Sequence, residues 1–121
     1  MSAPAGPWKV ERLVLDTGES PVQAFLEGLT GEDRIDALAL LKLLAQSGNA
    51  LRMPHSKALS EGLFELRGRQ VRIFYVFRPG HRIILLDGMV KKRGDIPPAV
   101  IKRVRRYQRD FEEAEARAAE E

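Results

Sequence analysis

The sequence contains no cysteine and only two histidines among its 121 residues. Without cysteine the chain cannot form disulfides or thiolate metal sites, which fits a protein of the reducing cytosol. No cluster of His, Cys and Asp has ligand spacing, so we expect neither a metal nor a cofactor. No apolar run is long enough to cross a bilayer, and residues 1–7 lack the basic and apolar regions of a secretion signal. We therefore expect no membrane partner and a cytoplasmic location.

Two kinds of catalytic motif are also missing. The glycines form no phosphate-binding loop, and no serine lies in a nucleophile-elbow setting. A chain of this length has room for one domain with one hydrophobic core. We expect a disordered leader at residues 1–7, the domain at 8–111 and an acidic C-terminal tail at 112–121.

Positive charge is abundant outside the C-terminal segment. The formal net charge is +3, but residues 110–121 contain six acids and one base. Residues 1–109 therefore contain 19 bases and 11 acids, a net charge of +8. A surface of this kind attracts polyanions, although many soluble proteins carry a solvated Lys/Arg surface with no such role. The acidic tail is interpreted as a solvated helix extension or, alternatively, as a segment that folds back on the basic surface.

The hydrophobic pattern predicts seven elements. Alternating apolar and polar residues predict strands at 8–15, 62–67 and 71–78, and a segment that is apolar along most of its length predicts a fourth strand at 82–91. Apolar residues three and four apart predict three helices. The first spans residues 21–29, the second follows a capping segment at 30–33, and the third begins at Pro97. Residues 50–61 are expected to form a loop because Pro54 interrupts them. The order β-α-α-β-β-β-α predicts an α+β fold, with helices on one face of a mostly antiparallel sheet and the other face free.

Alternation along the strands brings basic side chains to that second face. Arg67, Arg72 and the cluster at residues 91–93 are expected to converge on it from three neighbouring strands. Alternatively, Arg67 pairs with Glu65 or Asp87, Arg72 packs its stem over the sheet, and the cluster is a solvated strand end. Tyr75 shares its face only with apolar residues, so it is expected in the core. On the last helix, four basic residues form one face that is either solvated or in contact with RNA: Lys102, Arg105, Arg106 and Arg109.

Three segments together resemble a known family. These are PHSKALSEGLFELR at 54–67, VRIFYVF at 71–77 and MVKKRGDIPP at 89–98, followed by a helix. In order and spacing they resemble the HigB-like, phage-derived branch of the RelE/ParE superfamily, the toxins of type II toxin–antitoxin systems. The resemblance covers residues 8–111. It implies a RelE-like fold and a cytoplasmic mRNA endoribonuclease that acts on the ribosome without a metal and thereby inhibits translation.

The resemblance also implies roles for individual residues. Arg67, Arg72 and Lys92 would contact the phosphate, and Lys57 or His55 would be the base. The further RNA-binding candidates are Lys91, Arg93, Arg105 and Arg109. RelE-type enzymes often carry a tyrosine after the basic cluster, and some HigB enzymes use histidine or aspartate there. In this sequence residues 93–98 contain neither tyrosine nor histidine, which leaves Asp95 as the candidate acid–base group.

The partners implied are mRNA, the ribosome and a helix-turn-helix antitoxin encoded beside the gene. The alternative is a non-catalytic relative, either a ParE-like protein that acts on gyrase or a degenerate phage protein that only binds a partner. The basic sheet face distinguishes the two hypotheses, because a ParE-like protein does not need it.

Overall fold

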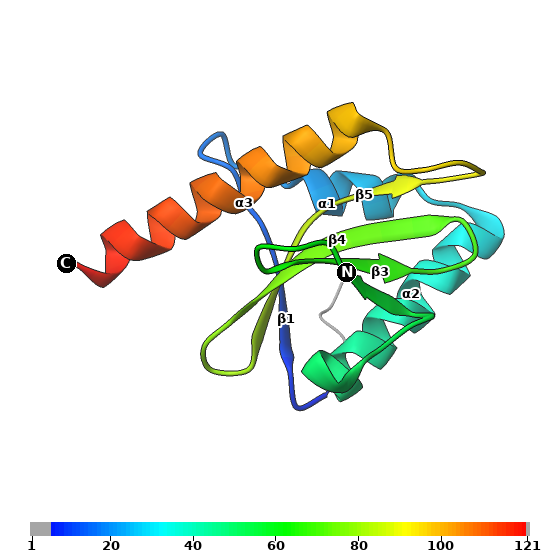
Figure 1. Ribbon diagram of the computed structural model, residues 1–121, viewed down its shortest axis with the longest axis horizontal. Helices are drawn as coiled ribbons and strands as arrows, with labels where there is room; N and C mark the ends of the chain where they lie inside the picture. Colours follow the sequence, from blue (N-terminus) through cyan, green and yellow to red (C-terminus); the bar gives the residue numbers. More distant parts are fainter. Residues whose placement is uncertain (1–5, 121) are drawn as a thin grey trace.

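Five strands form one sheet in the spatial order β1-β5-β4-β3-β2 (Figure 1). The strands are β1 (Lys9–Arg12), β2 (Ser56–Ala58), β3 (Leu63–Arg67), β4 (Val71–Arg78) and β5 (Arg82–Val90). The helices are α1 (Pro21–Gly28), α2 (Gly31–Ser47) and α3 (Pro98–Ala119), with a 3-10 turn at Gly48–Ala50. The structure is a computed structural model and describes residues 6–120. It confirms the expected α+β fold.

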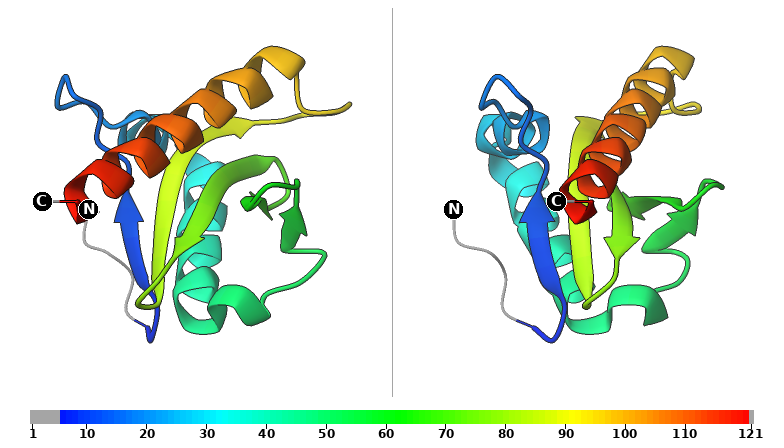
Figure 2. Two further views of the ribbon diagram at one scale, coloured as in Figure 1. Left: turned by 60° about the vertical axis from the view of Figure 1, so that its left-hand side comes forward. Right: turned by 90° about the vertical axis from the view of Figure 1, so that its left-hand side faces the viewer.

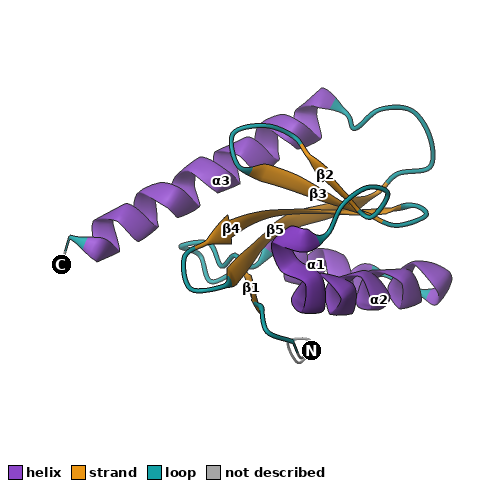
Figure 3. Ribbon diagram, turned by 60° about the horizontal axis from the view of Figure 1, so that its bottom comes forward, coloured by secondary structure: helices purple, strands orange, loops and turns teal. Residues whose placement is uncertain are grey.

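Helices α1 and α2 cover one face of the sheet (Figure 3). Ser20 begins α1 as its N-cap, since its hydroxyl accepts a hydrogen bond from the Gln23 N–H at 3.3 Å. The buried side of these helices packs on the residues of β4 that point toward them, Val71, Ile73 and Tyr75. This core is the one that the alternation along β4 predicts.

Helix α3 covers much of the opposite face, so the expectation of a free second face is wrong (Figure 2). Phe74, Val76 and Ile84 point to this side and are almost completely buried, together with Val104 of α3. Because β4 and β5 are apolar on both faces, each face has to be covered to remove those side chains from water. Helix α3 begins only at Pro98, so it leaves the end of this face beyond its start uncovered.

A β-bulge in β5 changes which residues point toward α3. Phe74 pairs with Asp87 while Tyr75 pairs with Leu85, so Leu86 is an extra residue in β5. As a result, Leu86 and Asp87 both lie on the α3 side of the sheet. The next residue, Gly88, lies against the Phe25 ring of α1, where a Cβ would collide with the ring.

Two further expectations need correction. The segment expected as a loop contains the strand β2, which pairs antiparallel with β3. Strand β1 is shorter than predicted. It runs parallel to β5, so the sheet is mostly antiparallel, as expected. The acidic tail continues α3 as far as Ala119, which agrees with its interpretation as a helix extension.

The expected leader at 1–7 lies mostly outside the described residues. Gly6 is described, and a Cβ at this position would collide with the carbonyl of Ala45 in α2. The end of that segment therefore packs against the domain. None of the helices in residues 6–120 is long and apolar enough to cross a membrane.

Candidate nucleic-acid interface

Strand pairing brings most of the predicted basic residues to one end of the sheet. Arg67 pairs with Arg72, which in turn pairs with Met89 of β5. The Lys91 N–H donates to the Gln70 carbonyl at 2.6 Å, which holds the segment after β5 beside the β3–β4 turn. In Figure 1 this turn and the segment after β5 lie at the end of the sheet opposite the β4–β5 hairpin. We call six residues there the basic edge: Lys57, Arg67, Arg72, Lys91, Lys92 and Arg93.

Strand β2 brings the two candidate bases to the same end. The Arg67 N–H donates to the His55 carbonyl at 2.8 Å, and Lys57 pairs with Glu65. Pairing across the sheet puts Lys57 and Glu65 in one row, on the same face as Arg67 and Arg72. The side chains of His55 and Lys57 are exposed, so both can approach a ligand.

Arg67 is held by an ion pair within the sheet. Its Nε lies 3.2 Å from Oε1 of Glu65, whose side chain is only 5% exposed. Its Nη1 contacts the Met53 sulfur at 3.6 Å. This confirms the alternative in which Arg67 pairs with Glu65. The pairing orients the guanidinium, and its side chain remains 26% exposed.

Arg72 is the buried cation of the basic edge and is only 7% exposed. Its Nη1 donates to the carbonyls of Gly68 at 2.8 Å and Val71 at 2.9 Å. Its Nε is buried without a hydrogen-bond partner among the described residues. Burial lowers the pKa of Arg72, against the attraction of Glu65. A guanidinium that has lost water without gaining an acidic partner favours an incoming anion.

The residues after β5 are more accessible. Lys91 is half-buried, whereas Lys92, Arg93 and Asp95 are exposed. At the edge of the sheet, His55 and Arg67 also line a hollow of about 350 Å³ between α2 and β3. The interface thus combines two anchored arginines with more accessible lysine side chains.

The two predicted RNA contacts on α3 lie apart from the basic edge. Arg105 donates to the carbonyls of Leu59 at 2.7 Å and Ser60 at 3.0 Å, in the turn between β2 and β3. This turn is at the far end of β3 from Arg67, so Arg105 connects α3 to the sheet. Arg109 is exposed, with its Nε 3.9 Å from Oδ1 of Asp110. The hydrogen bonds of Arg105 to this turn could not be predicted from the sequence, because they join residues that are far apart in the chain.

Arg103 is a basic residue that the sequence analysis overlooked. Its Nε donates to Oδ2 of Asp87 at 2.9 Å, and the other carboxylate oxygen accepts the Gly88 N–H at 2.8 Å. Asp87 is 9% exposed and Arg103 39% exposed, so the carboxylate anchors a partly accessible guanidinium. No partner among residues 6–120 occupies the two Nη groups of Arg103. Its position between Val100 and Val104, on the sheet side of α3, could have predicted that Arg103 faces the sheet.

Tyr75 belongs to the core on the α2 side, as predicted. Its hydroxyl lies 2.6 Å from Oγ of the buried Ser56. Burial raises the pKa of Tyr75, and the hydrogen bond with Ser56 opposes this only in part. This phenol therefore does not replace the tyrosine that is missing after the basic cluster.

Comparisons with known proteins give one family and one fold. A family model described as "Phage derived protein Gp49-like (DUF891)" matches residues 24–109. A search of curated proteins gives no match. Among solved structures, a chain of the toxin–antitoxin complex RelBE2 from Mycobacterium tuberculosis is similar, with a TM-score of 0.53 and 16% identity. The match covers 70% of this chain and 99% of that chain.

Proposed function

The chain belongs to the phage-derived Gp49-like family, and from this premise we propose that it is a toxin that cleaves messenger RNA. Membership and the shared RelE-type fold confirm the resemblance to the HigB-like branch of the RelE/ParE superfamily. The proposed toxin acts on mRNA in the ribosome and is inhibited by an antitoxin of the helix-turn-helix type.

The proposed reaction is an internal phosphoryl transfer. The 2′-oxygen of one nucleotide bonds to the adjacent phosphorus, and the bond from phosphorus to the next 5′-oxygen breaks. The 2′-hydroxyl proton passes to a base and a proton is delivered to the leaving oxygen, so the products are a 2′,3′-cyclic phosphate and a 5′-hydroxyl. DNA lacks the attacking hydroxyl and is not a substrate.

The basic edge supplies cations for the phosphate. Arg67 and Arg72 would bind the non-bridging oxygens, whose charge grows in the transition state, and Lys92 would approach from the segment after β5. Arg103 is a fourth candidate because Asp87 leaves its two Nη groups available. Lys57 or His55 is the proposed base, and Asp95 is the candidate acid.

One observation supports the proposal most strongly, the state of Arg72. A buried guanidinium with an unpartnered Nε contributes less to stability than an arginine with an acidic partner. The Nη2 group of Arg72 also has no hydrogen-bond partner among the described residues and, unlike Nε, is not enclosed, so a phosphate oxygen would bind the guanidinium there. The arrangement is therefore better suited to binding an anion than to stabilising the empty domain.

The test is primer extension on a messenger translated by purified bacterial components. The wild-type protein should produce new cuts at ribosomal A-site codons, and Arg72→Ala should reduce them about 100-fold or more. Arg78→Ala is the matched control, since Arg78 points to the same side at the other end of β4 and pairs with Glu115. This control should cut at the wild-type rate.

Other outcomes would overturn the proposal. If folded, antitoxin-free protein produces no cuts, the protein is a non-catalytic relative, and gyrase inhibition becomes the next assay. If Arg72→Ala and Arg78→Ala cut equally well, the basic edge is not the catalytic site.

A further inference from the structure

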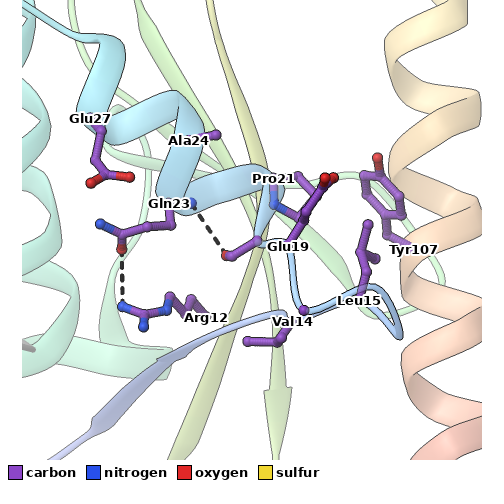
Figure 4. A pocket seen from close by; sticks show the side chains of 11 residues that line it. Arg12, Val14, Leu15, Glu19, Pro21, Gln23, Ala24, Glu27 and Tyr107 are labelled. Atoms are coloured by element: carbon purple, nitrogen blue, oxygen red, sulfur yellow. Dashed lines mark hydrogen bonds between the residues drawn. The ribbon is translucent and has the colours of Figure 1, made fainter.

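A groove lies on the side of the molecule where the β1–α1 loop faces α3. Its first part is a hollow of about 470 Å³ between α1 and the ring of Tyr107 (Figure 4). The second part, about 310 Å³, continues along α3. Both parts are lined by Val14, Leu15 and Tyr107, so the two hollows adjoin, and together we call them the acidic groove.

The floor of the groove is apolar and partly exposed. Val14 is 54% exposed, although its neighbour Leu13 is buried beneath α3. Phe111 and Ala114 extend the apolar lining along the helix. From Tyr107 to Arg117 the lining spans about 15 Å of α3, the length of about three helical turns. Apolar side chains of a bound helix would be removed from water along this length.

Carboxylates surround this floor. The acidic lining residues are Asp16, Glu19, Glu27, Asp110 and Glu113. The basic lining residues are Arg12, whose Nη1 donates to Gln23 at 3.1 Å, and Arg117. The lining thus carries a formal charge of −3 in a chain whose net charge is +3. Such a rim repels RNA phosphates and attracts a cationic segment.

We propose that this groove binds a basic, amphipathic segment of the partner antitoxin. The segment would place apolar side chains on Val14, Tyr107 and Phe111 and its lysines or arginines beside the carboxylates. That the partner is an antitoxin rests on the proposed function, whereas the chemistry of the segment follows from the groove itself. Because the groove and the basic edge lie on different parts of the molecule, the antitoxin can hold the toxin here while another part of it blocks the RNA site.

The experiment uses two synthetic helical peptides of about 14 residues. One carries leucines three and four apart with lysines elsewhere, and the other has glutamate in place of every lysine. Binding to the full chain is measured by isothermal titration calorimetry at two salt concentrations. The lysine peptide should bind with one-to-one stoichiometry and more weakly at the higher salt concentration, and the glutamate peptide should not bind.

Variants of exposed positions identify the surface. Val14→Asn should weaken binding of the lysine peptide at least about fivefold, because it removes an apolar anchor. The double variant Glu27→Gln/Glu113→Gln should weaken it by a similar factor and reduce its salt dependence. The matched controls are Ile35→Asn and Glu32→Gln on α2, both at exposed positions. They should change the affinity less than twofold.

Each remaining outcome overturns the inference. Equal affinity for the two peptides, no binding of either, or equal effects of groove and α2 variants would show that the groove has no such specificity. Sedimentation velocity of the chain alone tests a second copy as the occupant. If the chain self-associates and Val14→Asn abolishes this association, the occupant of the groove is another copy of the chain and not the antitoxin. None of these measurements involves RNA, so failure of the nuclease assay leaves their result unchanged.

Discussion

The basic edge and the opposite end of the sheet differ in the partners that their arginines have. In the basic edge, Arg72 is buried, has an unpartnered Nε and has a pKa lowered by burial. At the opposite end of the sheet, where β5 begins, Arg82 lies 2.7 Å from Glu11 and 2.9 Å from Glu115, and these hydrogen bonds raise its pKa. One arginine is stabilised by the protein itself, whereas the other still lacks an anionic partner. The difference indicates which end of the sheet is arranged for an external anion.

The basic edge and the acidic groove show why net charge alone says little about this chain. A formal charge of +3 combines six basic residues at one end with five acidic groove residues elsewhere. At 0.1 M ionic strength charges are screened beyond about 10 Å, so each region presents its own sign to a partner. We therefore expect substitutions in one region to leave binding at the other nearly unchanged. Three predictions test this, and a fourth concerns the ion pair of Arg82.

The largest effect is expected from a charge reversal in the basic edge. Lys92→Glu should lower the affinity for a 2′-O-methyl RNA oligonucleotide about 100-fold at low salt, because an attraction to phosphate becomes a repulsion. Fluorescence anisotropy measures this affinity on an RNA that cannot be cleaved. Lys42→Glu changes the net charge equally on the exposed side of α2 and should reduce affinity less than threefold. Equal losses would mean that RNA responds only to net charge.

A smaller effect is expected at Arg103. Arg103→Gln should lower the affinity for the same RNA about tenfold. It should also reduce the slope of log affinity against log salt concentration by roughly 0.7, which corresponds to the loss of one phosphate contact. Arg103→Lys can still pair with Asp87 and should bind RNA with intermediate affinity. Arg117→Gln, an exposed position at the other end of α3, is the control. An unchanged slope for Arg103→Gln would limit Arg103 to holding α3 on the sheet.

A gain of RNA affinity is expected when Arg67 loses its carboxylate partner. Glu65→Gln should raise RNA affinity about threefold, since the amide has no charge that competes with phosphate for Arg67. Glu27→Gln removes the same charge from the acidic groove and should leave the affinity within twofold. A larger gain from Glu27→Gln would contradict the electrostatic separation of the two regions.

The smallest effect concerns stability at acidic pH. The hydrogen bond with Arg82 lowers the pKa of Glu11 below its usual 4.5. Its contribution to stability is therefore complete above that value and disappears as the pH falls through the folded-state pKa. We expect the pair to contribute less than about 1 kcal/mol to the free energy of unfolding, because it is partly exposed. Urea unfolding of wild type and Glu11→Gln at pH 3 and pH 6 measures this contribution. If the two proteins differ in stability by the same amount at both pH values, the contribution does not come from the ionised Glu11.

The alternation along the strands predicted much of the candidate site. Arg67 and Arg72 lie on one face and pair directly, and the segment after β5 lies beside them, as expected. The pairing of Arg67 with Glu65 was also among the alternatives. Roles for these residues in binding or cleaving RNA stay predictions.

Other features could not be predicted because they depend on partners distant in sequence. The strand β2 has three residues and exists because β3 offers a free edge. Asp87 reaches Arg103 only because the bulge at Leu86 shifts the alternation of β5. Arg105 looked solvent-exposed on the helical pattern, yet it binds carbonyls 45 and 46 residues earlier in the chain.

The sequence by itself determined the α+β class, the order of the main elements and the face on which each β4 side chain lies. The spacing of apolar residues, every second residue in a strand and three or four apart in a helix, is a local property of the chain. It therefore predicts an element without knowledge of the elements that pack against it. The tertiary structure alone decided that α3 covers the second face, that Arg72 is buried without an acidic partner and that carboxylates from three segments surround one groove. These features depend on the packing of elements far apart in sequence, because burial and pairing are properties of the assembled layers.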